Sequence, residues 1–119
     1  MLNGLILKES LEETSVLDSL RVTRTETWQA SNAAAYQPNT WTALSFEADE
    51  RQADTLAEAL SRSLKPQGWY INASTATDVY VIFPNKVYKY RKGDSVQREE
   101  AKRYGLTVGI PESQLDWSE

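Results

Sequence analysis

The segment VYVIFPNKVYKY, residues 79–90, decides the fold because it predicts a β-hairpin on its own. Two runs rich in Val, Ile and Tyr, which favour strands, flank a Pro-Asn pair that favours a turn. With Pro84 and Asn85 at the tip, Ile82 opposes Val87 and the side chains alternate between two faces. Pro-Asn is not the Asn-Gly pair of a tight turn, so a loop one residue longer is an alternative that would reverse part of this register.

The hairpin is expected to bury one of its two faces against the core. In the two-residue register the apolar and aromatic side chains gather on one side, which is the expected core face. Its members are Val79, Val81, Phe83, Tyr88 and Tyr90. On the other side Tyr80 opposes Lys89 and Asp78 opposes Arg91, so this face is expected to point toward solvent.

Four segments upstream of the hairpin have the composition of strands, at residues 4–9, 20–28, 41–48 and 69–75. A single helical turn is expected soon after the first, and a long loop over residues 31–39 joins the second to the third. Uninterrupted alternation in the second strand places one set of side chains on the same face. This set is Leu20, Val22, Arg24, Glu26 and Trp28.

Two helix starts are marked by capping pairs, Asp49 with Gln52 and Asp94 with Gln97. The Asp can accept an amide hydrogen of the first turn while the Gln side chain reaches back. Apolar residues then recur at helical spacing, which predicts one buried face for each helix. They are Ala53, Leu56, Ala57, Leu60 and Leu64 in the first helix, and Ala101, Tyr104 and Val108 in the second.

These elements add up to an α+β domain. Short connections between neighbouring strands favour antiparallel pairing. We therefore expect a mostly antiparallel sheet of about six strands with two main helices packed on one face, in two layers. A chain of 119 residues suits a single domain spanning residues 1–119.

The residue types that are missing limit the chemistry. The chain has no Cys and no His, which excludes thiol nucleophiles, disulfides, thiolate zinc sites and Ser-His-Asp triads. An acid or base acting near neutral pH would need an Asp, Glu, Lys or Tyr with a strongly shifted pKa. We therefore predict no catalytic residue, no metal and no cofactor, and we favour a non-enzymatic role.

The only basic region of this acidic chain lies at and after the hairpin. Seven Lys or Arg and three Asp or Glu fall between residues 86 and 103, whereas the whole chain has a net charge of −4. Basic side chains here interleave with tyrosines, a pattern that can hold a phosphate backbone and stack bases. The candidate polyanion-binding residues are Lys86, Lys89, Arg91 and Lys92. The alternative is that they protect an exposed strand edge, and the net charge has the wrong sign for a nucleic-acid binder.

Aromatic side chains gather around the loop over residues 31–39. Trp28 and Trp41 flank the loop from adjacent strand ends, and Tyr36 lies within it. Together with Asn39 they could line a shallow apolar cleft for a small ligand. The alternative is that these aromatics only pin a long loop to the body of the domain.

Six phrases of the chain are specific enough to suggest a relationship. They are GLILKES, RVTRTETW, QPNTWTALSFE, ALSRSLKPQGWY, VYVIFPNKVYKY and GIPESQLDW. Together they resemble a family of small, uncharacterised bacterial proteins over nearly the whole chain. That family has no assigned activity, cofactor or catalytic residues, so the resemblance implies a bacterial cytosolic protein and transfers no site.

The sequence favours a module that binds another protein or itself as a homodimer. An acidic sheet domain with an open sheet edge and many Trp and Tyr side chains, which each carry a polar atom, supports this hypothesis. A small-ligand binder or hydrolase that uses the cleft near Trp28 and Trp41 is the first alternative, and weak binding of single-stranded nucleic acid is the second. No run of roughly 20 apolar residues is present, so we expect a cytoplasmic protein without a membrane partner.

Overall fold

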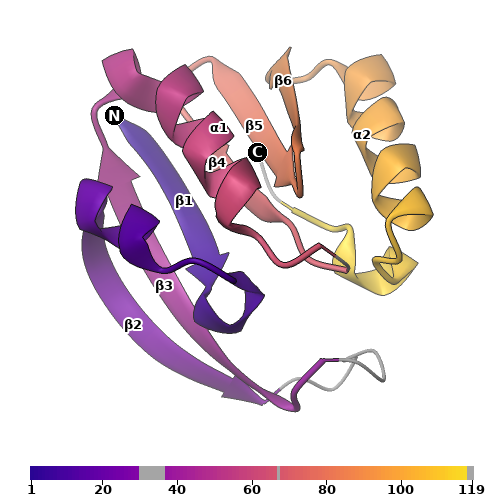
Figure 1. Ribbon diagram of the computed structural model, residues 1–119. Coiled ribbons are helices and arrows are strands. Elements are labelled where there is room, and N and C mark those ends of the chain that lie inside the picture. Colours follow the sequence, from indigo (N-terminus) through magenta and orange to yellow (C-terminus); the bar gives the residue numbers. More distant parts are fainter. Residues whose placement is uncertain (30–36, 67, 118–119) are drawn as a thin grey trace.

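The computed structural model of the protein describes residues 1–29, 37–66 and 68–117. Within these ranges six strands form one sheet in the order β2-β3-β1-β4-β5-β6, and all neighbouring strands are antiparallel (Figure 1). The strands are β1 (Leu2–Leu7), β2 (Arg21–Gln29), β3 (Thr40–Ala48), β4 (Ile71–Ser74), β5 (Asp78–Phe83) and β6 (Lys86–Arg91). The helices are α1 (Ala53–Ser63) and α2 (Ser95–Thr107), with short 3₁₀ helices η1 (Lys8–Ser10), η2 (Ser15–Ser19), η3 (Glu50–Gln52) and η4 (Glu112–Gln114). The predicted α+β class, antiparallel sheet and two main helices are confirmed.

Helix α1 covers one face of the sheet. The chain passes from β3 through α1 to β4, and both of these strands pair with β1 between them (Figure 1). The predicted apolar stripe of α1 is buried, and Leu60 is fully enclosed. It packs into a cluster with β1, β4 and β5 through Leu2, Ile6, Ile71, Tyr80 and Ile82.

Helix α2 belongs to a second cluster on the opposite face. Along β5, Val79, Val81 and Phe83 alternate with Tyr80 and Ile82, and the two sets belong to different hydrophobic clusters. The second cluster includes Ala101 from α2 and Ile110, Leu115 and Trp117 from the C-terminal segment. The helices therefore do not share one face as the sequence analysis expected. Because β5 is apolar on both sides, each side needs its own cover, and the domain has three layers over this part of the sheet.

The hairpin has the predicted two-residue register. Ile82 pairs with Val87, Tyr80 with Lys89 and Asp78 with Arg91. At the tip of the hairpin Asn85 adopts a positive φ of 60°, a conformation that Asn tolerates better than most residues. The buried Ser61 hydroxyl of α1 also donates to the Phe83 carbonyl at 2.6 Å, which ties the hairpin tip to the helix.

Strand β2 departs from the predicted alternation. Its pairing with β3 shifts between Val22 and Arg24, where a β-bulge interrupts the register. The bulge adds one residue, so Trp28 lies on the face opposite to that of Val22 and directly across from Trp41. This change brings the two tryptophans together on the face that α1 does not cover.

No helix in the described ranges combines the length and the apolar character needed to cross a membrane.

Candidate ligand-binding pocket

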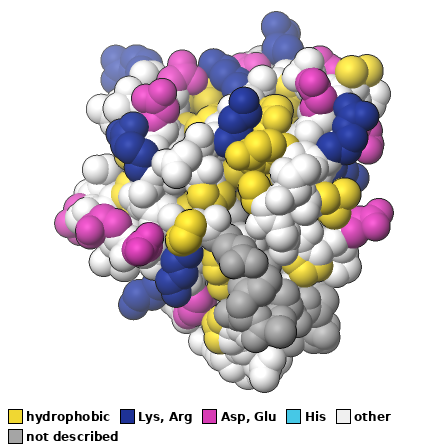
Figure 2. Space-filling view, turned by 45° about the vertical axis from the view of Figure 1, so that its right-hand side comes forward, with side chains coloured by type: hydrophobic (Ala, Val, Ile, Leu, Met, Phe, Trp, Pro, Cys, Tyr) yellow, Lys and Arg dark blue, Asp and Glu magenta, His cyan; other side chains and the backbone are white. Residues whose placement is uncertain are grey.

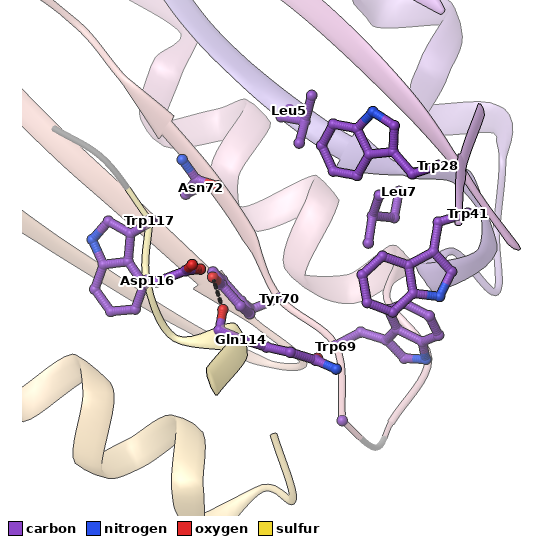
Figure 3. A pocket seen from close by; sticks show the side chains of 11 residues that line it. Leu5, Leu7, Trp28, Trp41, Trp69, Tyr70, Asn72, Gln114, Asp116 and Trp117 are labelled. Atoms are coloured by element: carbon purple, nitrogen blue, oxygen red, sulfur yellow. Dashed lines mark hydrogen bonds between the residues drawn. The ribbon is translucent and has the colours of Figure 1, made fainter. Parts of the chain in front are cut away.

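A pocket of about 410 Å³ opens on the face of the sheet opposite α1 (Figure 3). Helix α2 and the C-terminal segment cover this face at β5 and β6, while β1 and β3 are less covered. The floor of the pocket consists of half-buried side chains from the central strands, Leu5 and Leu7 of β1 and Asn72 of β4. Aromatic side chains from segments far apart in the sequence form the walls.

Three tryptophans form the first wall. The Trp41 and Trp69 rings meet edge to face, with centroids 5.9 Å apart. Trp41 Nε1 donates to the Pro38 carbonyl at 2.8 Å, so its polar atom is satisfied inside the protein. Trp41 and Trp69 are only 8% and 5% exposed, whereas Trp28 is 37% exposed. Trp28 therefore presents most of the indole surface that a ligand could reach on this wall.

The C-terminal segment, residues 110–117, forms the second wall against Tyr70. The Tyr70 hydroxyl donates to the Gln114 carbonyl, and the Tyr70 ring packs edge to face on Trp117 at 5.6 Å. Burial raises the pKa of Tyr70 well above its ordinary value, and the negative charge of Asp116 raises it further. Tyr70 is therefore a neutral hydroxyl at physiological pH.

Trp117 is anchored from the side away from the pocket. Its Nε1 donates to the hydroxyl of the buried Tyr90 at 2.9 Å. The Arg98 guanidinium lies over the Trp117 ring at 4.9 Å and donates to the Trp117 carbonyl at 2.6 Å. These contacts hold the second wall against β6 and α2.

The charged side chains of the described lining are all of one sign, negative. Asp116 contributes a carboxylate, and the described lining residues include no Lys or Arg. The close-up shows Asp116 beside the hydroxyl end of Tyr70, at the opposite end of the pocket from Trp28 (Figure 3). The pocket thus has an aromatic end and an acidic end.

The structure brings together only part of the predicted cleft. Trp28 and Trp41 both line the pocket, whereas Asn39 is exposed and is not among its lining residues. Tyr36 lies outside the described residues. Sequence reasoning missed Trp69, Tyr70, Asn72, Gln114, Asp116 and Trp117.

Stacking of bases on the hairpin would require exposed tyrosine rings beside the basic side chains, and the structure does not place them so. Lys86, Lys89, Arg91 and Lys92 are exposed, but the tyrosines beside them belong to the second hydrophobic cluster, where Tyr90 is buried and Tyr88 is half-buried. Lys89 and Arg91 lie on the opposite face from those tyrosines, as the register predicted. On the side where α2 comes forward, basic and acidic side chains are interspersed (Figure 2).

Lys89 is also engaged within the protein. Its Nζ lies 3.3 Å from the Asp54 carboxylate and 5.3 Å from the centre of the Tyr80 ring. Asp54 in turn accepts a hydrogen bond from the Tyr80 hydroxyl at 2.9 Å. The Tyr80 hydroxyl and, after it, the Lys89 ammonium lower the pKa of Asp54. This cluster links α1 to β5 and β6.

Comparison with known proteins adds no assignment. No family model matches the sequence, and neither a curated protein nor a solved structure matches it. The bacterial origin implied by the resemblance above therefore stays a prediction. Within the described ranges no group of three or more acidic side chains is placed to hold a metal ion.

Proposed function

We propose that this protein is a non-enzymatic, cytoplasmic binding protein whose binding site is the pocket between Trp28 and the C-terminal segment. One observation carries the proposal: the partly exposed Trp28 ring stands at a pocket of about 410 Å³ whose opposite wall is held by internal hydrogen bonds. Pockets for small organic molecules usually measure about 300–1,000 Å³ and are lined by aromatic side chains with a few polar groups.

Binding without catalysis suits Tyr70 and the amide side chains of this pocket. The pKa of Tyr70 is raised, away from neutrality, so its hydroxyl is not a base near pH 7. Its proton is already donated to the Gln114 carbonyl. Asn72 and Gln114 supply amide groups, which can orient a ligand by hydrogen bonds but do not exchange protons near neutral pH.

Tryptophan fluorescence and thermal shift against a library of small aromatic compounds test this proposal. We expect some compounds to quench the fluorescence and raise the melting temperature of the native protein. Trp28→Ala should lose these responses, whereas Val96→Ala should keep them, because Val96 is exposed on α2 and does not line the pocket. A flat response of the native protein across the library, with the protein folded, would refute the proposal.

Self-association through β2 is a second candidate function. Strand β2 is at the edge of the described sheet, and all of its residues except Glu26 are exposed, including Val22 at 41% and Trp28 at 37%. An exposed edge strand can pair with a second copy or with another protein. The bulge and the charged Arg21 and Arg24 work against such pairing, so we rank it second.

Sedimentation at increasing concentrations tests the second candidate. We expect a concentration-dependent dimer that Val22→Lys weakens, because the substitution would bury a second positive charge, next to Arg21, where the two β2 strands pair. Val96→Lys on α2 is the matched control and should leave the dimer intact. A protein that is monomeric at every concentration would exclude a homodimer of this kind.

A further inference from the structure

We infer that the ligand of this pocket is a small organic cation, a flat aromatic ring that carries a protonated amine. The inference rests on the proposed function and specifies its ligand class. The ring is placed against Trp28 and the ammonium group near Asp116. Three properties of the lining lead to it: the sign of the charge, the exposed indole surface, and the hydrogen-bonding capacity of the polar end.

The charge of the pocket selects against anions. Asp116 is exposed and lines the pocket, and it forms no salt bridge with any residue of the described ranges. Arg98 does not line the pocket, although its positive charge acts on Tyr70; its guanidinium lies over the Trp117 ring and donates to the Trp117 carbonyl. Inside the pocket an anionic ligand would meet the Asp116 carboxylate and no Lys or Arg among the described lining residues, whereas a cation would be attracted to that carboxylate.

The aromatic end favours a flat ring and tolerates a positive charge. Trp28 is the tryptophan of the first wall with an accessible ring, since Trp41 and Trp69 largely cover each other. An indole face stacks on planar rings and attracts cations through its quadrupole. Leu5 and Leu7 on the floor add apolar contact between the two ends.

The polar end offers mainly acceptors. The Tyr70 hydroxyl donates to the Gln114 carbonyl and its oxygen accepts from the Asp116 backbone, which leaves one further lone pair to accept. The Asp116 carboxylate is an acceptor, and it lies beside that hydroxyl (Figure 3). An ammonium group provides three donors and no acceptor. It therefore complements this end better than a neutral carbonyl or a carboxylate.

Three probes with the same ring and different charges test the inference: tryptamine, indole and indole-3-acetate. Equilibrium dialysis or isothermal titration at low ionic strength should rank tryptamine first, about tenfold tighter than indole-3-acetate. Asp116→Asn should remove most of this preference. Glu112→Gln is the matched control, because Glu112 is a nearby exposed acid that does not line the pocket, and it should leave the preference unchanged.

The possible failures are distinguishable. If indole-3-acetate binds as tightly as tryptamine, or if Asp116→Asn leaves the preference unchanged, the inference about charge is overturned while the proposed pocket stands. If none of the three probes binds but library compounds do, the ligand class is wrong and the pocket again stands. If nothing binds to the folded native protein, the proposed function and the inference fail together.

Discussion

Gln37 and Gln114 pair their side-chain amides across the end of the pocket. Gln114 Nε2 donates to Gln37 Oε1 at 2.9 Å, and Gln37 Nε2 lies 3.3 Å from Gln114 Oε1 and 3.0 Å from the Gly68 carbonyl. Gln37 precedes β3, and Gln114 belongs to the C-terminal segment. The pair therefore joins the two sides of the chain that carry the tryptophan wall and the Tyr70 wall.

Removing either amide should destabilise the fold. Gln37 is buried, so Gln114→Ala leaves part of a buried amide without its partner, which costs about 1–3 kcal/mol. Urea unfolding of Gln37→Ala, Gln114→Ala and the double variant should show that the double variant loses less than the sum of the two single variants. Gln29→Ala, in an exposed position on β2, is the control and should change the free energy of unfolding by less than about 0.5 kcal/mol. Strictly additive losses would contradict the pairing.

Gly4 is required at the centre of the sheet. A Cβ at this position would lie 2.6 Å from Phe46 Cζ and 2.8 Å from Ala73 Cβ, on the two neighbouring strands. Gly4→Ala should therefore lower the free energy of unfolding by about 1–3 kcal/mol through overpacking. Phe46→Leu in the same chain should restore part of this loss, as measured by thermal or urea unfolding.

Gly93 provides the contrasting control. It has a φ of 88°, and a Cβ at this position would meet no atom within 4 Å apart from those of its chain neighbours, so Gly93→Ala should cost about 1–2 kcal/mol through backbone strain alone. Phe46→Leu should not rescue this variant. Equal rescue of both glycine variants would show that the crowding around Gly4 is not the cause.

Local features of the sequence were sufficient to predict the hairpin and α1. The register of Ile82 with Val87 depends on neighbouring residues and a short turn, and the stripe through Leu60 depends on helical spacing, so both could be read from short windows. The bulge after Val22 could not be predicted, since no Gly or Pro marks it. The side of the sheet that α2 covers could not be predicted either, because β5 is apolar on both faces.

The residues of the candidate site also fall into a group that the sequence could predict and a group that it could not. Trp28 and Trp41 were predicted together because they flank one loop in the chain, and the structure places them opposite each other. Tyr70 and Trp117 are separated in sequence both from each other and from the tryptophan pair. They join the site because β4 pairs with β1 and the C-terminal segment packs beside Tyr70. Strand order and the path of the last residues are tertiary properties that no short window contains.

The carboxylate of Asp49 should titrate at unusually low pH. Hydrogen bonds from the Arg51 side chain and backbone lower the pKa of Asp49 from 3.8 to about 2, and Arg51 Nη2 lies 2.7 Å from the carboxylate. Since the folded-state pKa is depressed, the contribution of this contact is present above pH 3.8 and is lost as the pH falls toward 2. In Arg51→Gln, NMR titration should show the pKa of Asp49 returning toward 3.8. An unchanged pKa would rule out the Arg51 side chain as the main cause.

Alkaline pH should destabilise the protein through Tyr70. Burial and Asp116 raise the pKa of this phenol above the ordinary value of 10, so the unfolded chain ionises Tyr70 before the folded one does. The stabilising contribution of neutral Tyr70 is therefore complete below pH 10 and declines as the pH rises above it.

Urea unfolding of the native protein and of Tyr70→Phe, from pH 8 to pH 11, measures this effect. The native protein should lose its advantage over Tyr70→Phe as the pH rises, because Phe cannot ionise. A difference between the two proteins that stays constant over the whole range would mean that Tyr70 does not ionise preferentially in the unfolded state, and the raised pKa would be refuted.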